Sequence, residues 1–438
     1  MNKYPRVLVI NNEPFHSGSA TGLTMLSLFR YWPSDKLAQV YTLDIQPDID
    51  ISIQSYNFHL RDLRVPGFVN RAIERRLSTA FLQADVDSQN NSFAENATAP
   101  LSISNTITKN IRHLLLLFLY LAPYELNSKF SAWLNEYKPE IIYSMLPELN
   151  VMRLVLQISD LLEIPIVTHF MDDWPATLHR NDFGRMLLLP YSTFLLKSIL
   201  KRSPRSLTIS ESMATEYKKR YGKKFDPFML CVEPDEIYKP DQEYSCGPVK
   251  FVFIGGLHLD RWKSLREIGI AMMALHKEGV EIECSIYTQK INVERYKEKL
   301  NIPPVMRIVG SLNHEEVTHI QRKADCLIHI ESFGNWDKMY TRHSISSKIP
   351  EYLAAGRPIL SYGPEGIASI EYLQALSCGE VVTTQHIDCL KTAITKIAVS
   401  RELRETMGIN AIVACKKNHN STDQRERFKQ VFLDVSNN

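Results

Sequence analysis

Short apolar runs alternate along the chain with segments whose apolar residues recur at helical spacing. Continuous runs occupy residues 6–11, 140–144, 164–170, 205–209, 249–254, 281–286, 305–309, 326–330, 358–361 and 379–383. Helical spacing occupies residues 23–32, 149–162, 265–277, 315–324 and 387–399. Short continuous runs are typical of parallel strands buried on both faces. Their alternation with helices predicts an α/β fold, in which helices cover both faces of parallel sheets.

The length of the chain and one polar interruption divide this pattern into two domains. At 438 residues, of which 44% are hydrophobic, the chain is long enough for roughly two to three domains. Residues 233–248 combine three prolines with Asp, Gly and Ser and have no apolar period, which predicts a linker. We therefore expect an N-terminal domain at 1–232, a C-terminal domain at 249–415, and a C-terminal helix at 416–438 that packs back toward the N-terminal domain. The polar residues 85–106 predict a mobile loop.

Charge and cysteine content narrow the classes of protein. The 51 basic and 49 acidic residues leave a net charge of +2, so nucleic acid is not an expected partner. Seven cysteines without a CxxC pair fit neither a disulfide framework nor a zinc site, which favours a reducing cytosol. The N-terminus lacks the apolar core of a signal peptide, and the apolar run at 114–122 is about half the length of a membrane span. We expect a cytoplasmic protein.

A glycine-containing turn follows the first apolar run. Gly18, Ser19 and Gly22 lie between that strand and the next helical segment. Glycines in such a turn let backbone N–H groups approach an anion at the N-terminus of a helix. The sequence is neither GxGxxG nor a Walker loop, and the glycines could equally serve only the turn.

Two cations occupy the corresponding turn of the C-terminal domain. Arg261 and Lys263 follow the strand at 249–254 and precede a helical segment. Paired cations suit the two phosphoryl groups of a diphosphate. The alternative is a solvated first helical turn, which is disfavoured because cations oppose the helix dipole there.

A third group of polar residues follows the strand at 326–330. It comprises Glu331 and, further on, Ser346, Ser347, Lys348 and Glu351, before a helix that ends at Gly356. A carboxylate on that helix can accept both hydroxyls of a ribose, and the N–H groups near the two serines can face its phosphates.

Together these motifs resemble the GT-B retaining glycosyltransferases of the family 4 type. Glu351, followed by Ala355-Gly356-Arg357-Pro358-Ile359, matches the second half of that family's paired-glutamate motif. Glu331-Ser332-Phe333-Gly334 is similar to its Glu-Gly-Phe-Gly, but Glu331 precedes Glu351 by 20 positions instead of about eight. Either Glu331 keeps the family role at the end of a longer loop, or polar groups at 344–348 have taken it over.

The resemblance implies two Rossmann-like doubly wound domains that face a central cleft, with the donor mainly on the second domain and the acceptor on the first. It implies transfer of a sugar, with retention, from a nucleoside-diphosphate sugar to a glycan or lipid-linked acceptor in bacterial surface polysaccharide assembly. No cofactor and no metal are expected, because cations and helix N-termini would stabilise the departing diphosphate. The donor-binding residues that it implies are Gly18, Ser19, Gly22, Arg261, Lys263, Gly310, Ser346, Ser347, Lys348 and Glu351.

Asp172 and Asp173 follow the apolar run at 164–170, where the family has an Asp- or His-bearing loop near the reacting sugar. With Glu331 they are the candidate catalytic residues, and His169 is the histidine of most interest. Two adjacent carboxylates could instead bind a metal or cap the next turn.

Two basic stretches in the N-terminal domain suggest contact with an anionic membrane. Residues 61–76 include Arg71, Arg75 and Arg76 among five arginines, and residues 197–224 hold nine lysines or arginines. Basic amphipathic helices bind anionic lipid, so we expect peripheral binding to the inner face of the cytoplasmic membrane. An ordinary solvated face is the alternative.

Two other functions fit the same features. A nucleotide-sugar epimerase resembles this fold and would act on a donor without an acceptor. A non-catalytic GT-B scaffold would fit the displaced Glu331.

Overall fold

The computed structural model describes residues 4–48, 53–64, 121–177, 188–238 and 247–437. They form two compact units: unit 1 holds residues 1–228 and 425–438, and unit 2 holds residues 229–424. The predicted loop at 85–106, residues 114–120 of the apolar run, and Arg71, Arg75 and Arg76 lie outside the described residues. Residues 239–246 of the expected linker do so as well.

Unit 1 is built on a parallel sheet, which in the described residues has seven strands in the order β3-β2-β1-β4-β5-β6-β7. The strands are β1 (Val7–Ile10), β2 (Leu37–Tyr41), β3 (Gln54–Asn57), β4 (Ile141–Ser144), β5 (Ile166–Phe170), β6 (Arg205–Thr208) and β7 (Phe225–Pro227). Every residue of β1, β4 and β5 is buried, as their continuous apolar sequences predict. The apolar pattern did not predict β2, β3 and β7.

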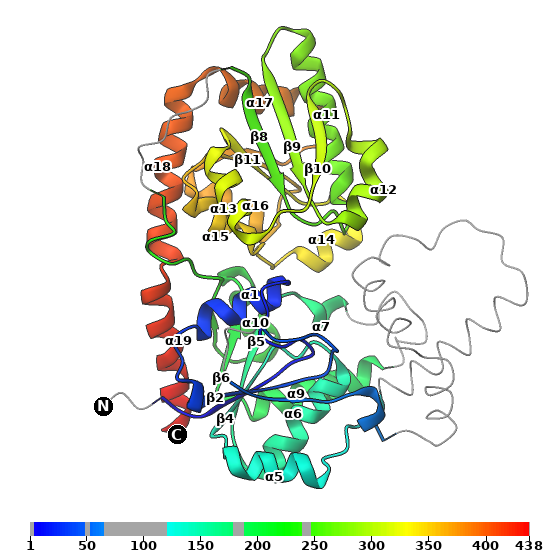
Figure 1. Cartoon of the computed structure of the whole chain (residues 1–438), viewed down its shortest axis with the longest axis vertical. Helices are drawn as coiled ribbons and strands as arrows, with labels where there is room; N and C mark the ends of the chain where they lie inside the picture. The colour runs from blue at the N-terminus through cyan, green and yellow to red at the C-terminus, as the bar shows by residue number, and fades with distance from the viewer. Residues whose placement is uncertain (1–3, 49–52, 65–120, 178–187, 239–246, 438) are drawn as a thin grey trace, which may run out of the picture. The chain divides into compact units, whose positions relative to one another are not determined.

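Helices surround this sheet (Figure 1). They are α1 (Ala20–Phe29), α5 (Ser128–Tyr137), α6 (Leu149–Leu162), α7 (Trp174–Thr177), α9 (Leu189–Lys201), α10 (Glu211–Tyr221) and α19 (Ser421–Ser436). Two short 3-10 turns lie at Ser34–Lys36 and Leu60–Asp62. Helix α19, red in Figure 1, brings Phe428 and Phe432 against Phe29 of α1 and Tyr143 of β4. Residues from the end of the chain therefore complete the core of unit 1.

Unit 2 repeats the same plan with six parallel strands, in the order β10-β9-β8-β11-β12-β13 within the part of the chain that the structure describes. They are β8 (Val249–Ile254), β9 (Ile282–Tyr287), β10 (Met306–Gly310), β11 (Cys326–Ile330), β12 (Ile359–Tyr362) and β13 (Gly379–Val382). The helices are α11 (Arg261–Lys277), α12 (Lys290–Leu300), α13 (His314–Lys323), α14 (Asn335–Thr341), α15 (Lys348–Ala354), α16 (Ala368–Leu376), α17 (Ile387–Val399) and α18 (Arg401–Asn418).

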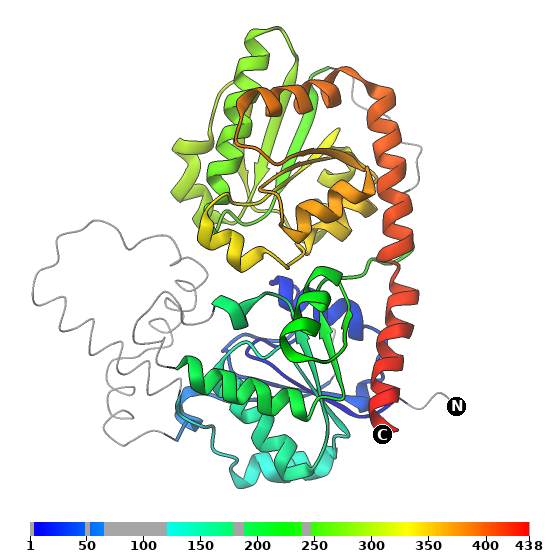
Figure 2. The same cartoon turned by 180° about the vertical axis from the view of Figure 1, so that it is seen from behind.

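The helices of unit 2 pack against one another around its sheet. Helix α11 contacts α12 and α17, α15 and α16 contact α18, and α17 contacts α18. Figures 1 and 2 show these helices from opposite sides. Among the described residues, every helix of the chain is too short or too polar to cross a membrane.

Each sheet has a point where the strand order reverses. In unit 1 this point lies between β1 and β4, and in unit 2 it lies between β8 and β11. In such doubly wound sheets, ligands bind beyond the carboxyl ends of the strands at the reversal point. The Rossmann-like architecture predicted from the sequence is confirmed for both units, and it directs attention to the loops after these strands.

His169, which the sequence singled out, belongs to the core of unit 1 and not to that edge. Its side chain in β5 is fully buried; Nδ1 lies 2.8 Å from the Tyr143 hydroxyl and Nε2 lies 3.1 Å from the Phe228 carbonyl oxygen. Burial lowers the pKa of His169 from 6.5 to about 4, although hydrogen bonds to the Phe228 and Thr208 backbone raise it. The imidazole is therefore neutral and both of its nitrogen atoms are occupied.

We expect His169 to make the stability of the protein depend on pH. Between pH 6.5 and about 4 the unfolded chain binds a proton on this residue and the folded chain does not, so the free energy of unfolding falls as pH falls, by at most about 3 kcal/mol. Urea unfolding at pH 7.5 and pH 5 should therefore show a smaller pH effect in His169→Gln than in the wild type. His386→Gln supplies the control, because it makes the same substitution at an exposed side chain. Equal pH effects in wild type and His169→Gln would contradict this role.

Candidate active site

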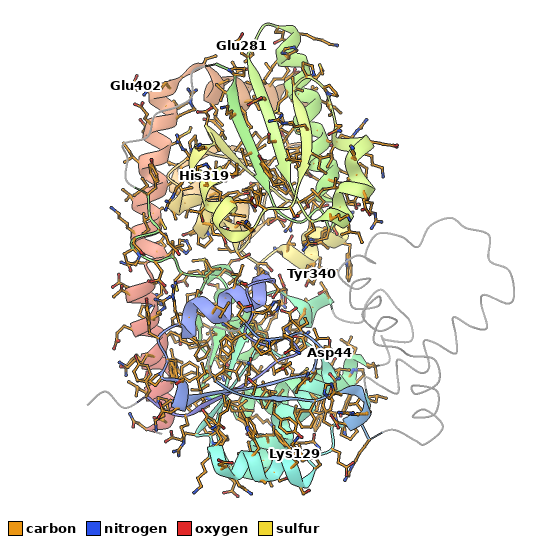
Figure 3. The ribbon with its side chains drawn as sticks, in the orientation of Figure 1. Asp44, Lys129, Glu281, His319, Tyr340 and Glu402 are labelled. Atoms are coloured by element: carbon orange, nitrogen blue, oxygen red, sulfur yellow. The ribbon has the colours of Figure 1, made fainter. Side chains whose placement is uncertain are left out.

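Two predicted donor residues and the predicted catalytic Glu331 lie at or after the carboxyl ends of strands of unit 2. Arg261 opens α11 after β8, Gly310 ends β10, and Glu331 directly follows β11. Figure 3 shows Tyr340, on α14, at the opposite end of unit 2 from Glu281, which precedes β9. Glu281 marks the amino ends of the strands, so the candidate site is at the edge where a doubly wound sheet binds ligands.

The centre of this edge is an ion pair between Arg261 and Glu331. Arg261 Nη2 lies 2.9 Å from Glu331 Oε2, and the two side chains are 17% and 3% exposed. Arg261 Nη1 also lies 3.2 Å from His258 Nε2. On the other side of the carboxylate, His329 Nε2 lies 3.5 Å from Glu331 Oε1. The sequence singled out both members of the pair but not their contact.

The charge of Glu331 is fixed by these neighbours. Burial by itself raises the pKa of Glu331, but the Arg261 charge, together with the nearby His329 side chain, outweighs it and lowers the pKa to about 2. The carboxylate is therefore ionised at neutral pH. Because it is buried, it needs a cationic partner, which Arg261 supplies.

The backbone holds Glu331 and the start of α11 together. The Glu331 N–H donates to the Tyr362 carbonyl oxygen at 2.8 Å, and the Ser264 hydroxyl donates to the Glu331 carbonyl oxygen at 2.8 Å. A side chain at Gly363 would approach the Glu331 Cβ to 2.7 Å, so glycine leaves room for it. The first turn of α11 is thus attached to the end of β11.

The two lysines of the predicted donor site have more accessible partners. Lys263 Nζ lies 2.6 Å from Asp260 Oδ2, and the lysine side chain is 57% exposed. Lys348 Nζ lies 3.1 Å from Glu351 Oε2, which also accepts from Gln321 Nε2 at 3.3 Å. Each predicted donor cation of unit 2 therefore has a carboxylate beside it, and only the Arg261 pair is deeply buried.

The remaining predicted donor residues of unit 2 are Ser346, Ser347 and Gly310, and they differ in hydrogen bonding and in the space around them. The Ser346 N–H donates to Ser369 Oγ at 3.2 Å, and Ser347 precedes α15 without a hydrogen bond from its side chain to the helix. Gly310 has a φ of +148°, and a Cβ there would meet no atom within 4 Å. The space beside Gly310 is open, whereas one amide expected to face a phosphate already has a partner.

The long spacing between Glu331 and Glu351 has a structural cause. Helix α14 lies between them, and the sequence did not predict it. Before this helix, the Ser332 hydroxyl donates to Asp337 Oδ2 at 2.6 Å and accepts from the Gly334 N–H at 3.1 Å. The extra residues thus form an ordered helical connection.

In unit 1 the glycine turn packs closely on itself. Ser19 Oγ accepts from the Gly22 N–H at 3.0 Å and so caps α1. A Cβ at Gly22 would lie 1.9 Å from the His16 carbonyl oxygen, so this position requires glycine. The Gly18 N–H donates to His16 Nδ1 at 3.1 Å, and the Ser17 N–H donates to Asp48 Oδ2 at 2.8 Å. Close packing therefore explains the glycine at position 22. The backbone N–H groups of Ser17, Gly18 and Gly22 already have hydrogen-bond partners within unit 1.

Asp173 is engaged by other side chains of unit 1. Its two carboxylate oxygens accept from Arg220 at 2.7 and 2.8 Å, and Tyr217 donates to it at 3.0 Å. Asp172, one residue earlier, is half-buried in the loop between β5 and α7. Among the described residues, no three His, Cys, Asp or Glu side chains are grouped so that they could hold a metal ion.

No protein-family model and no curated protein sequence matches the chain. Solved structures do match its fold over nearly the full length. HepE of Anabaena, solved with UDP and glucose, has a TM-score of 0.62 at 10% identity, over 98% of this chain and 99% of its own. Sucrose-phosphate synthase of Thermosynechococcus elongatus has a TM-score of 0.60 at 11% identity, over 99% of both chains.

A UDP-forming α,α-trehalose-phosphate synthase of Burkholderia vietnamiensis has a TM-score of 0.57 at 10% identity, over 99% of this chain and 100% of its own. Identities this low establish the fold alone. Together with the two parallel Rossmann-like sheets, they show that the chain has the GT-B fold.

Proposed function

We propose that the chain is a retaining glycosyltransferase that moves a sugar from a nucleoside-diphosphate donor to a glycan or lipid-linked acceptor in bacterial surface polysaccharide assembly. The observation that carries this proposal is Arg261, at the start of a 17-residue helix and at the ligand-binding edge of a Rossmann-like sheet. A guanidinium has five N–H donors, and the bonds to Glu331 and His258 leave others for a phosphate.

The electrostatics of α11 support an anionic ligand. Its first turn carries Arg261 and Lys263 and no acidic residue, which opposes the helix dipole. A diphosphate would offset that repulsion, because its negative charge would interact with both cations.

The two cations would meet the diphosphate differently. Lys263 and Asp260 form an exposed pair three residues apart, and such pairs contribute only about 0.2–0.5 kcal/mol. Lys263 can therefore turn toward a phosphate at little cost. Arg261 is held by a buried carboxylate and keeps its place, so it supplies a fixed charge where the departing diphosphate becomes more negative.

Glu351 is the residue that we propose for the ribose. Its carboxylate is 18% exposed and is steadied by Lys348 and Gln321, which leaves lone pairs for two hydroxyl groups. In unit 1, Asp172 is our candidate for contact with the acceptor, because it is half-buried in the loop that follows the carboxyl end of β5. Uridine diphosphate glucose is the first donor to test, since HepE was solved with UDP and glucose.

An anionic membrane surface is the location that we propose for a lipid-linked acceptor. Much of the basic stretch at 197–224 is already engaged within unit 1. Of its nine basic residues, Arg202, Arg205, Arg220 and Lys224 pair with acidic side chains, and Lys223 donates to backbone carbonyl oxygens.

Helix α9 offers a more suitable face for this contact. Phe194 is 64% exposed on α9, and the exposed Lys197 and Lys201 follow it at positions three and seven residues further on. These three side chains share one face of the helix, which combines an apolar contact with positive charge.

We predict that the chain transfers glucose or another hexose from a nucleoside-diphosphate sugar and that Arg261→Ala slows transfer. The loss should be about 100-fold or more, as for other groups that stabilise developing charge. NMR of the product should show the anomeric configuration of the donor, and EDTA should leave the rate unchanged.

The same assay separates the alternatives. Conversion of the donor sugar without an acceptor would indicate an epimerase. Binding of the donor with neither transfer nor hydrolysis would indicate a non-catalytic scaffold. Inversion of configuration would contradict the proposed reaction.

Vesicles containing anionic lipid should sediment the protein at 0.1 M salt and release much of it at 1 M, because the Debye length falls from about 10 Å to about 3 Å. Changing Lys197 and Lys201 to Glu should reduce this binding. Lys129→Glu on α5 makes the same type of charge change on another exposed helix of unit 1 and should have little effect (Figure 3). Binding that ignores lipid charge and the α9 substitutions would contradict the membrane proposal.

A further inference from the structure

We propose that Glu331 is a positioning residue, whose carboxylate fixes the Arg261 guanidinium for the donor diphosphate and does not contact the donor sugar. This inference rests on the proposed function, because it assigns Arg261 to the diphosphate. It differs from the catalytic role that the sequence suggested for Glu331.

The burial of Glu331 is the first observation behind this proposal. Its side chain is 3% exposed, and each carboxylate oxygen faces a side chain of the same unit: Oε2 faces Arg261 at 2.9 Å and Oε1 faces His329 at 3.5 Å. The backbone is fixed on both sides, through Tyr362 and Ser264. The carboxylate therefore points into unit 2, and a sugar hydroxyl would have to displace Arg261 to reach Oε2.

Arg261 occupies the layer between this carboxylate and solvent. Its side chain is 17% exposed, whereas that of Glu331 is 3% exposed. His258 contacts its other terminal nitrogen. Two neighbours thus hold the guanidinium by its two ends, and a ligand would meet the arginine before the glutamate.

A buried ion pair is by itself weak evidence for stability, because desolvation of both charges offsets their attraction. Its effect here is on the orientation of Arg261. A guanidinium that two acceptors already hold loses less side-chain conformational entropy when a phosphate binds. Lys263 and Lys348 provide the contrast, because each pairs with an acid three residues away on its own helical turn and is more exposed than Arg261.

Calorimetric titration can separate a role through Arg261 from direct contact with the sugar. The ligands are inorganic pyrophosphate, UDP and UDP-glucose, and the variants are Glu331→Gln, Arg261→Gln and the double substitution. We expect Glu331→Gln to lower the affinity for UDP and the affinity for UDP-glucose by the same factor, about 10- to 100-fold, the range for a hydrogen bond to a charged group. The affinity for pyrophosphate should fall in parallel. In the Arg261→Gln background, Glu331→Gln should change affinity less than about twofold.

Two further variants guard against a general folding defect. Glu331→Asp keeps the charge at shorter reach and should recover part of the UDP affinity that Glu331→Gln loses. Glu402→Gln removes an exposed carboxylate at the start of α18 and should bind every ligand as the wild type does (Figure 3). Circular dichroism should show that each variant is folded at the temperature of the titration.

The outcomes distinguish this inference from the proposed function. Loss of affinity for UDP-glucose alone would place Glu331 on the sugar and overturn the positioning role, as would full additivity with Arg261→Gln. Coupled losses of UDP affinity in a protein that transfers no sugar would support the positioning role and remove the proposed function. A wild-type chain that binds none of the three ligands would contradict both.

Discussion

The ion pair between Arg261 and Glu331 is the interaction on which the candidate chemistry of unit 2 depends. It joins the first residue of α11 to the residue that follows β11 at the point where the strand order reverses. A cation at the start of a helix is unfavourable without a nearby anion, and a buried carboxylate is unfavourable without a cation. Each residue thus offsets the cost of the other, and the more exposed guanidinium is held at the ligand-binding edge above the buried carboxylate.

Unit 1 contains a similar ion pair between a carboxylate that follows a strand and an arginine on a helix. Asp173 follows β5 and is bound in a bidentate pair by Arg220 of α10, much as Glu331 follows β11 and is bound by Arg261 of α11. The arginine of unit 1 is 28% exposed and also bonds to Glu216, so its charge is compensated twice. The arginine of unit 2 has one carboxylate partner among the described residues, together with a histidine. This difference is why we assign the anionic ligand to unit 2.

The sequence predicted most of the strands because their residues are apolar without interruption, as in β1 and β5. It missed β2, where the buried Gln39 interrupts the run; its amide accepts from the Phe15 N–H and donates to Ser55. Strand β3 lies at the edge of the sheet and is polar. Pattern alone cannot identify strands whose polar side chains are satisfied by tertiary contacts.

For the site, motif spacing identified Arg261, Glu331 and Glu351 singly. It could not show that α14 fills the long interval between the two glutamates, nor that Glu331 turns inward to Arg261, because both depend on packing between distant segments. His169 was singled out because it lies near the carboxyl end of an apolar run, but every residue of β5 is buried, and the hydrogen bonds of His169 with Tyr143 and Phe228 place it in the core.

A crystal structure of the protein with UDP bound tests most directly whether the Arg261–Glu331 pair holds the diphosphate. We expect an oxygen of the diphosphate within hydrogen-bonding distance of the Arg261 guanidinium, with Glu331 still paired to that arginine at about the present 2.9 Å. A diphosphate bound away from α11, or an Arg261 that leaves Glu331 when UDP binds, would contradict it.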